Sequence, residues 1–246
     1  AIFLISYSIF NVMKKEFNIN LNKATFFAGH SLGEYSALSC AGYIKFSDTL
    51  KILKIRGEAM QNAVPEGIGG MIAILGTTIK KIEDLILENK EDFKVQIAND
   101  NSVGQIVVSG KLADLESFVK ILKLQGIRSI KLPVSAPFHC ELMGKATNIM
   151  KHEINKLEFN EGYNVLMSNV TADKIQDISE IKNLLIKQIE NRVRWRESVI
   201  NMVNDGVNNF IEIGPGKVLS GLIKRINKEV NVQSINTIED IKNLSI

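Results

Sequence analysis

The chain has 246 residues, 45% hydrophobic and 23% charged, with a formal net charge of +3 at pH 7. This length and apolar content predict a sizeable core, in one α/β domain or a domain with an inserted subdomain. The small net charge and the lack of a long basic run argue against nucleic-acid binding, and no apolar run approaches the roughly 20 residues of a membrane helix. The two cysteines, Cys40 and Cys140, form no CxxC or cysteine–histidine cluster. We therefore expect no metal site and no secreted disulfide scaffold, and a reducing compartment is favoured.

The first part of the chain predicts helices around one short buried strand. In order, these are a helix over 2–13, a strand over 24–28, a glycine-bounded turn over 29–33, and helices over 31–41 and 47–62. Ser47 is the expected N-cap of the last helix. Pro65 and the glycines after it then mark a subdomain boundary. Because the chain starts without methionine and inside an apparent helix, we expect an upstream portion, including the first strand, to be missing.

The middle of the chain predicts a βαββαβ order. The expected strands are 71–75, 95–99, 105–109 and 128–132, and the expected helices are 79–89 and 112–125. This order is the signature of a ferredoxin-like unit, and Gly126 stands where a helix C-cap glycine belongs. We therefore predict an inserted ferredoxin-like small subdomain over 65–133.

Strands and helices alternate again in the last part of the chain. The expected elements are a loop over 133–139, a long helix to about 157, a strand over 165–169, two helices flanking Trp195, a strand over 209–213 and a helix from Lys217. Such alternation predicts a parallel sheet covered on both faces. The predicted α/β core thus comprises residues 1–64 and 134–246.

Residues 29–33, Gly-His-Ser-Leu-Gly, fit the pattern GxSxG. This short pattern is weak evidence by itself because glycine is common. Here it lies between an expected strand and an expected helix, which is the context of a nucleophile elbow, a tight turn that exposes the serine oxygen. The context favours Ser31 as a nucleophile.

A serine nucleophile needs a base, and the chain has three histidines. His30 adjoins Ser31 on a sharp turn, where its side chain should diverge from the hydroxyl. His152 lies between Lys151 and Glu153 on an expected helix, which indicates a solvated face. His139 ends a proline-bracketed loop after an expected strand, where α/β folds place their sites. His139 is therefore the expected base, and the alternative is a structural loop histidine.

Longer motifs resemble the malonyl-CoA:acyl carrier protein transacylases. The matching segments are 29–35 (GHSLGEY), 56–61 (RGEAMQ), 98–102 (ANDNS) with Gly104 and Gln105, 135–139 (SAPFH), Gln188 with Asn191 and Trp195, and 214–219 (GPGKVL). The resemblance covers nearly the whole chain and implies a hydrolase-like core that carries the small subdomain. It also implies an acyltransferase that moves malonyl from malonyl-CoA to the phosphopantetheine thiol of acyl carrier protein, for fatty acid synthesis. The implied cycle is ping-pong through a malonyl-serine, without a metal or a cofactor beyond coenzyme A and phosphopantetheine as carriers.

The resemblance further implies a Ser31–His139 dyad. The main-chain carbonyl of Gln188 takes the third role and fixes the imidazole tautomer. The N–H of Leu32 is one oxyanion donor, and the family draws a second from an N-terminal Gly-Gln-Gly loop that this sequence lacks. Since loss of one donor costs about a hundred- to a thousandfold in rate, we expect this polypeptide to be a poor catalyst. Asp100 and Asp114, which could serve as triad acids, are assigned to loop and helix-start roles.

Arg56 resembles the arginine that holds the malonyl carboxylate, for which a planar guanidinium offers two parallel hydrogen bonds. Its alternative is a solvated arginine. Phe138 and Leu32 resemble positions that are associated with a preference for malonyl over methylmalonyl substrates. The alternative is that these side chains only pack in the core. Asn99 and Asn101 resemble residues of the pantetheine or acyl channel, against a hairpin-turn alternative.

A basic C-terminal helix carries Lys217, Lys224, Arg225 and Lys228 and could meet an acidic carrier protein, although a solvated helix face is an equal alternative. We expect a monomer that binds no nucleic acid and no membrane. Frequent Asn, Lys and Ile favour an AT-rich genome, hence a bacterial cytoplasm or a plastid stroma. The alternative functions are a serine thioesterase or hydrolase, a non-catalytic acyltransferase-like domain, and a fragment of a multidomain synthase.

Overall fold

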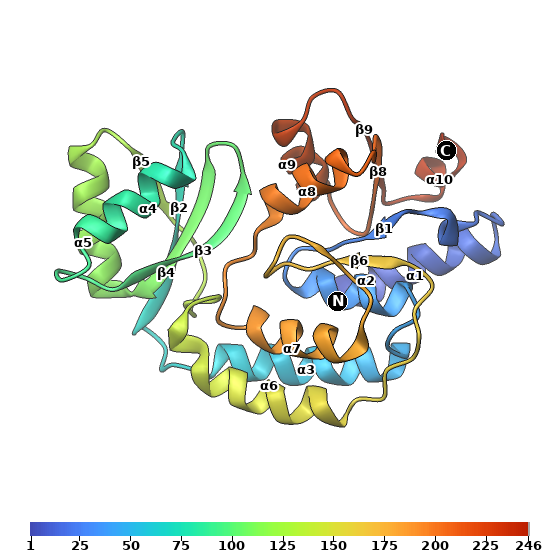
Figure 1. Ribbon diagram of the computed structural model, residues 1–246, viewed down its shortest axis with the longest axis horizontal. Helices are drawn as coiled ribbons and strands as arrows, with labels where there is room; N and C mark the ends of the chain where they lie inside the picture. The colour runs from blue at the N-terminus through green and yellow to red at the C-terminus, as the bar shows by residue number, and fades with distance from the viewer. Residues whose placement is uncertain (246) are drawn as a thin grey trace. The chain divides into compact units, whose positions relative to one another are not determined.

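The computed structural model describes residues 1–245 and shows a mixed α/β protein (Figure 1). Contacts along the chain divide it into two compact units. The first unit comprises Ala1–Leu53, Leu157–Ile181 and Arg196–Ile246, and the second comprises Lys54–Lys156 and Lys182–Trp195. The expected small subdomain, 65–133, lies inside the second unit, and its boundaries stay a prediction.

The first unit holds two small sheets and the helices around them. Its elements are α1 (Ile2–Lys15), a 3-10 turn (Leu21–Lys23), β1 (Phe26–Phe27), α2 (Leu32–Cys40), the start of α3 (Phe46–Gln61), β6 (Val165–Met167), β7 (Lys174–Ile175), the start of α7 (Ile178–Gln188), most of α8 (Trp195–Asn204), β8 (Asn209–Ile213), α9 (Val218–Ile226), β9 (Asn231–Ile235) and α10 (Ile238–Lys242). β1 pairs with β6, and β8 with β9, in parallel, whereas β7 joins β6 antiparallel. Parallel pairing is therefore present, but in two small sheets, one of which also has an antiparallel strand, instead of the single parallel sheet expected.

The apolar face of α1 forms much of the core of the first unit. Phe10 and Met13 of this helix are buried with Leu21, Ile235 and Ile241, so α1 packs beside β9 and α10. The ring of Phe10 meets the ring of Phe27 of β1 edge-on, with centroids 6.0 Å apart. Burial of such apolar area contributes roughly 25 cal/mol per Å², and here it holds β1 in place ahead of the turn at 29–33.

The second unit is built on one four-stranded antiparallel sheet. Its strands are β2 (Gly69–Leu75), β3 (Val95–Ser102), β4 (Gln105–Lys111) and β5 (Arg128–Lys131), in the order β3-β4-β2-β5. The helices are α4 (Ile79–Glu88), α5 (Leu112–Leu124) and α6 (Gly144–Lys156), preceded by a 3-10 turn (Glu141–Met143), with the ends of α3 and α7. Gly126 follows α5 with a φ of 68°, as expected of a C-cap glycine.

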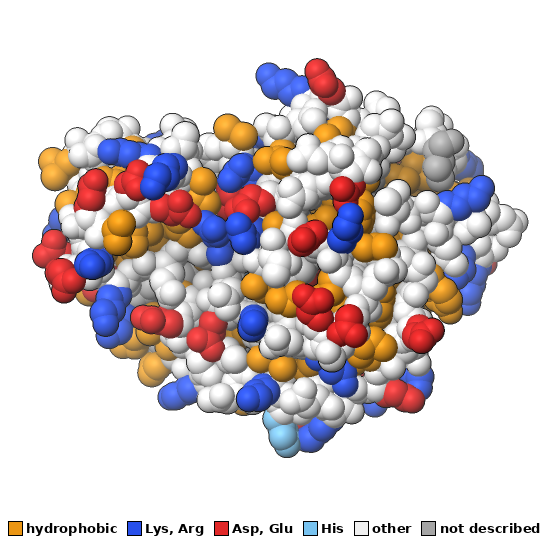
Figure 2. Space-filling view, viewed as in Figure 1, with side chains coloured by type: hydrophobic (Ala, Val, Ile, Leu, Met, Phe, Trp, Pro, Cys, Tyr) orange, Lys and Arg blue, Asp and Glu red, His pale blue; other side chains and the backbone are white. Residues whose placement is uncertain are grey.

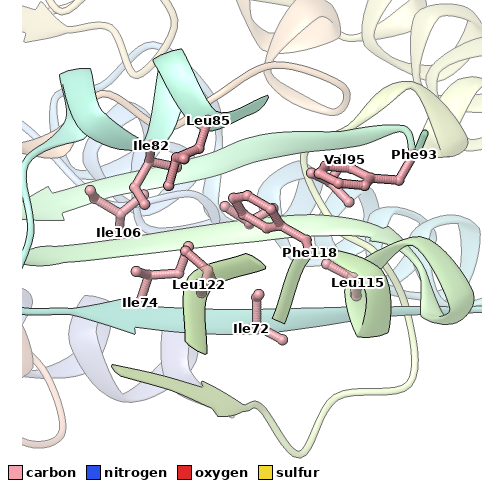
Figure 3. Packing of buried hydrophobic residues seen from close by; sticks show 11 residues of the cluster. Ile72, Ile74, Ile82, Leu85, Phe93, Val95, Ile106, Leu115, Phe118 and Leu122 are labelled. Carbon is pink, nitrogen blue, oxygen red and sulfur yellow. The ribbon is translucent and has the colours of Figure 1, made fainter. Parts of the chain in front are cut away.

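The two faces of this sheet are covered by different parts of the chain. Ile72 and Ile74 of β2 point to the face on which α4 and α5 pack, around the buried ring of Phe118 (Figure 3). Met71 belongs to a cluster on the other face, with Ala98 and Val107, against which Leu132, Val134 and Phe138 pack. The alternation follows from the two-residue period of a strand. As a result, the loop at 133–139 lies against the face of the sheet opposite the helices.

Several boundaries differ from those expected. α3 begins at Phe46, so Ser47 lies in its first turn and is not its N-cap. β3 continues past Asn99 to Ser102, and Trp195 begins α8 instead of lying between two helices. β7, β9 and α10 were not expected, because their apolar residues are few and show no clear period.

Positive and negative side chains are interspersed on the face shown in Figure 2. Within residues 1–245, no helix is both long enough and apolar enough to cross a membrane. In the same residues, no three His, Cys, Asp or Glu side chains are grouped as they would be to hold a metal ion.

Candidate active site

Ser31 lies on a sharp turn between β1 and α2, with a φ of 54° and a ψ of −104°. This conformation is strained for a residue with a side chain, and such strain persists only where the surroundings impose it. A serine on a strained strand-to-helix turn is the geometry of a nucleophile elbow. The expected elbow at residues 29–33 is thus present, and half-buried Ser31 stands at its apex.

The two glycines of the elbow have different steric roles. A Cβ at Gly29 would lie 2.0 Å from the main-chain oxygen of Gly33, whereas a Cβ at Gly33 would meet no atom within 4 Å. The turn is so tight that residue 29 must lack a side chain. The main-chain N–H of Gly33 donates to the carbonyl of His30 at 2.9 Å, which closes the turn.

Asn169, which the sequence analysis did not single out, fastens the elbow from a neighbouring strand. Its Oδ1 accepts from the N–H of Ser31 at 2.7 Å, and its Nδ2 donates to the carbonyl of Gly29 at 2.8 Å. Its own N–H donates to Glu34 Oε1 at 3.2 Å, and its side chain is buried. Asn169 follows β6, which runs parallel to β1, so the carboxyl ends of both strands meet at one edge. Its place at a strand end is the signal that could have identified it.

Leu32 is the first residue of α2, so its N–H has no acceptor within the helix. In a nucleophile elbow this N–H points toward the developing oxyanion. The main-chain position of Leu32 therefore fits the expected role, which stays a prediction together with the role of its side chain.

In the second unit, the chain on both sides of His139 is fixed to three strands of the sheet. Ser109 Oγ of β4 donates to the carbonyl of Phe138 at 2.6 Å, and Gln96 Oε1 of β3 accepts from the N–H of Glu141 at 2.7 Å. A Cβ at Gly69 of β2 would lie 2.4 Å from the Pro137 ring, so this glycine allows the close approach of the loop. Phe138 is half-buried in this contact, which supports the packing alternative for its side chain.

His139 is 4% exposed and has a φ of 58°. Its Nδ1 lies 2.8 Å from the main-chain oxygen of Gln188, at the end of α7. Because a carbonyl oxygen can only accept, Nδ1 carries the proton and Nε2 keeps the basic lone pair. The expected contact between His139 and Gln188 is present, and it gives the imidazole the tautomer that a general base needs.

Arg56 lies near the end of α3 and is 6% exposed, so the alternative of a solvated arginine is wrong. Its Nη2 donates to the side-chain Oε1 of Gln188 at 2.9 Å. The second unit thus brings Arg56, His139 and Gln188 together, while Ser31 and Leu32 belong to the first unit.

Asn99 and Asn101 lie inside β3 and are buried, so the hairpin-turn alternative is wrong for both. β3 is irregular here, with register shifts between Ile97 and Asn99 and between Asp100 and Ser102. Asp100 is a fully buried strand residue and not a loop residue as expected. The channel roles of Asn99 and Asn101 stay predictions.

The segment after α7 is tied to this part of β3. Asn99 forms a parallel bridge with Val193, whose N–H donates to Ala98 and whose carbonyl accepts from Asp100. The bridge anchors the chain just past Gln188 to the sheet. A hollow of about 450 Å³ within the same unit is lined in part by His139, Asn191 and the apolar side chain of Ile97.

The remaining expectations concern His152, Asp114 and the basic C-terminal helix. His152 is exposed, with its Nδ1 2.9 Å from Glu153 Oε1, as predicted for a solvated face. Asp114 lies in the first turn of α5, as predicted. The basic helix is shorter than expected, because α9 ends at Ile226 and leaves Lys228 beyond it, and Lys224 Nζ donates to the carbonyl of Val230.

Burial raises the pKa of the Cys40 thiol to about 12 and that of the Cys140 thiol to about 11. The thiolate is the reactive form of cysteine. Both thiols are therefore protonated at neutral pH and are poor nucleophiles, which leaves Ser31 as the better candidate.

Comparison with known proteins places the chain in a family. The profile described as "Acyl transferase domain" matches residues 1–243. The malonyl CoA-acyl carrier protein transacylase of Bacillus subtilis is 42% identical over 221 residues, which cover 88% of this chain and 69% of the relative. That of Staphylococcus aureus (strain MRSA252) is 41% identical over 225 residues, covering 91% and 73%.

Solved structures agree with the sequence relatives. The acyl-carrier-protein-S-malonyltransferase of Bartonella henselae superposes with a TM-score of 0.94 at 42% identity, covering 98% of this chain and 77% of that one. A malonyl-transacylase solved in complex with its type II polyketide acyl-carrier protein superposes with a TM-score of 0.92 at 35% identity, covering 98% and 77%. The chain therefore belongs to the acyl transferase domain family, among the malonyl-CoA:acyl carrier protein transacylases.

Proposed function

We propose that this protein transfers the malonyl group from malonyl-CoA to the phosphopantetheine thiol of acyl carrier protein, supplying fatty acid synthesis. The observation that carries the proposal is the strained turn at Ser31, held by Asn169 between β1 and α2 in a chain of this family. The choice of malonyl as the acyl group and of acyl carrier protein as the acceptor is supported by the names of the relatives.

In the proposed cycle, His139 Nε2 takes the proton of the Ser31 hydroxyl as the oxygen attacks the malonyl thioester. The tetrahedral oxyanion is stabilised by the N–H of Leu32. Its collapse breaks the C–S bond, and His139 returns the proton to the coenzyme A sulfur as the thiol leaves. The carrier's thiol then attacks the malonyl-serine ester by the same route in reverse, giving malonyl-carrier protein and free Ser31.

Arg56 is the proposed partner of the malonyl carboxylate. It is buried and keeps its charge at any physiological pH, so a carboxylate that enters the site neutralises it. An acetyl group brings no such charge. Asn99, Asn101 and Phe138 are proposed to line the path of the acyl group or its pantetheine arm.

The proposal is tested by mass spectrometry of the intact protein after incubation with malonyl-CoA. The expected result is a covalent adduct of one malonyl group that disappears in Ser31→Ala and is discharged by holo-carrier protein. Absence of the adduct from a correctly folded wild-type chain would favour a non-catalytic domain. Rapid loss of the adduct to water, with no transfer to the carrier, would favour a thioesterase.

Finer features of the architecture also belong to this proposal. The βαββαβ order with strands arranged β3-β4-β2-β5 supports a ferredoxin-like subdomain, and the parallel pairs β1–β6 and β8–β9 support a hydrolase-like core. We further propose a monomer that needs no metal or redox cofactor, binds neither nucleic acid nor membranes, and acts in a bacterial cytoplasm or a plastid stroma. Docking of the carrier on Lys224 and Arg225 stays a prediction, and charge reversal there should slow carrier-dependent transfer.

A further inference from the structure

Gln188 contacts both functional groups of the second unit through two different atoms. Its main-chain oxygen accepts from His139 Nδ1 at 2.8 Å, and its side-chain Oε1 accepts from Arg56 Nη2 at 2.9 Å. Gln188 is fully buried, and the residues it holds are buried as well. One residue thus connects the expected base to the expected carboxylate-binding group.

The two contacts can be separated by substitution. The main-chain oxygen is present whichever side chain stands at position 188, so the contact with His139 does not require glutamine. Only the contact with Arg56 requires a side-chain acceptor of this length. A glutamine at position 188 is therefore needed for the hydrogen bond with Arg56 and not for the hydrogen bond with His139.

A neutral acceptor suits an arginine that must receive an anion. A guanidinium has five N–H donors in one plane, and a bidentate contact with a carboxylate requires that plane to be fixed. The amide oxygen of Gln188 engages one donor without neutralising the charge. A carboxylate at the same position would form an ion pair with Arg56 and compete with an incoming acyl carboxylate.

We propose that the side chain of Gln188 is a positioning residue that fixes the guanidinium of Arg56 and thereby sets the preference for acyl groups that carry a carboxylate. The inference rests on the proposed function and deepens it. It assigns the side chain a role in specificity that is separate from the contact of its main chain with the base.

The test compares Gln188→Met and Gln188→Glu with the wild type in transfer from malonyl-CoA and from acetyl-CoA. Methionine has a similar size and lacks a strong acceptor, so the malonyl-to-acetyl ratio of kcat/KM should fall on the order of tenfold, the effect of one hydrogen bond to a charged group. Glutamate should lower the ratio further. Lys187→Met changes an exposed side chain on the same turn of α7 and should leave the ratio unchanged.

Two measurements separate positioning from general damage. In an Arg56→Met background, Gln188→Met should change the ratio no further, because the two residues act through one contact. The pH dependence of residual transfer should keep its wild-type midpoints, because the carbonyl acceptor of His139 remains. The inference is wrong if Gln188→Met lowers malonyl and acetyl transfer by the same factor, or if it changes the ratio equally without Arg56.

A binding experiment keeps this inference distinct from the proposed function. In Ser31→Ala no acyl-serine forms, so calorimetry reports the Kd values of malonyl-CoA and acetyl-CoA without turnover. Adding Gln188→Met should selectively weaken malonyl-CoA. If the wild type transfers no malonyl group the proposed function fails, while an unchanged ratio of Kd values overturns the role of Gln188.

Discussion

The side-chain oxygen of Asn169 accepts a hydrogen bond from the main-chain N–H of Ser31 at 2.7 Å, and the nitrogen of the same amide donates to the carbonyl of Gly29. The amide thus holds the main chain on both sides of His30, immediately before the strained residue Ser31. It satisfies a donor and an acceptor that the sharp turn removes from regular secondary structure. Part of the strain at Ser31 is therefore offset by a residue that follows a different strand, β6.

Replacing Asn169 should impair acylation more than folding. In Asn169→Leu both contacts are lost and the serine oxygen shifts, so the rate of malonyl-serine formation should fall about ten- to a hundredfold. Asn169→Asp keeps an acceptor for the N–H of Ser31 and should lose less. Rapid-quench measurement of the adduct gives the rates, with exposed Asn160→Leu as the control. Equal rates in all three variants would contradict a role for Asn169 at the elbow.

The two elbow glycines should respond oppositely to alanine. Gly29→Ala places a methyl group against the main chain of Gly33 and should lower the free energy of unfolding by about 1–3 kcal/mol or more. Gly33→Ala adds a methyl in open space within α2 and should be neutral or stabilising by up to about 1 kcal/mol. Urea unfolding followed by circular dichroism measures both. A similar loss in the two variants would show that the turn is not as tight as described.

Arg56 should be needed for the acyl carboxylate more than for the chemistry. Arg56→Met removes the charge that pairs with malonate, so the malonyl-to-acetyl ratio of kcat/KM should fall about tenfold to a hundredfold. The loss should appear mainly in KM for malonyl-CoA, because the contact is made in ground state and transition state alike. Steady-state kinetics with malonyl-CoA and acetyl-CoA measure this ratio. An unchanged ratio would show that Arg56 does not bind the malonyl carboxylate.

The two cysteine thiols, one half-buried and one buried, should make the protein less stable at alkaline pH. Their folded pKa values, about 12 for Cys40 and about 11 for Cys140, lie above the unfolded value of about 8.5. The unfolded state therefore loses these protons first, and stability falls as pH rises above about 9, by up to about 1.4 kcal/mol per pH unit for each thiol. Because other groups titrate in the same pH range, the contribution of one thiol is measured as the difference in the free energy of unfolding between the wild type and a variant that lacks it. Cys140→Ala should show a shallower loss between pH 8 and pH 10 than the wild type.

The sequence pattern around residues 29–33 predicted the elbow. The position of Asn169 was not predicted, because it depends on contacts between distant parts of the chain. The glycines around Ser31 and the flanking apolar runs lie within a few residues of one another, so their pattern was readable. Asn169 reaches the elbow only because β6 pairs with β1 across a large sequence separation. Asn99 was expected to end a strand, since asparagine disfavours strands, but pairing with β4 continues β3 to Ser102.

The bridge between Asn99 and Val193 joins residues nearly a hundred positions apart in the sequence. Closing so long a segment costs chain entropy before any contact rewards it, and non-local pairings accordingly form slowly. During refolding the antiparallel sheet of the second unit should assemble first. The segment from Gln188 to Val193 should then dock onto it. Recovery of the circular dichroism signal of the sheet would then precede recovery of transferase activity, and the interval would report how long after sheet formation the carbonyl of Gln188 reaches His139.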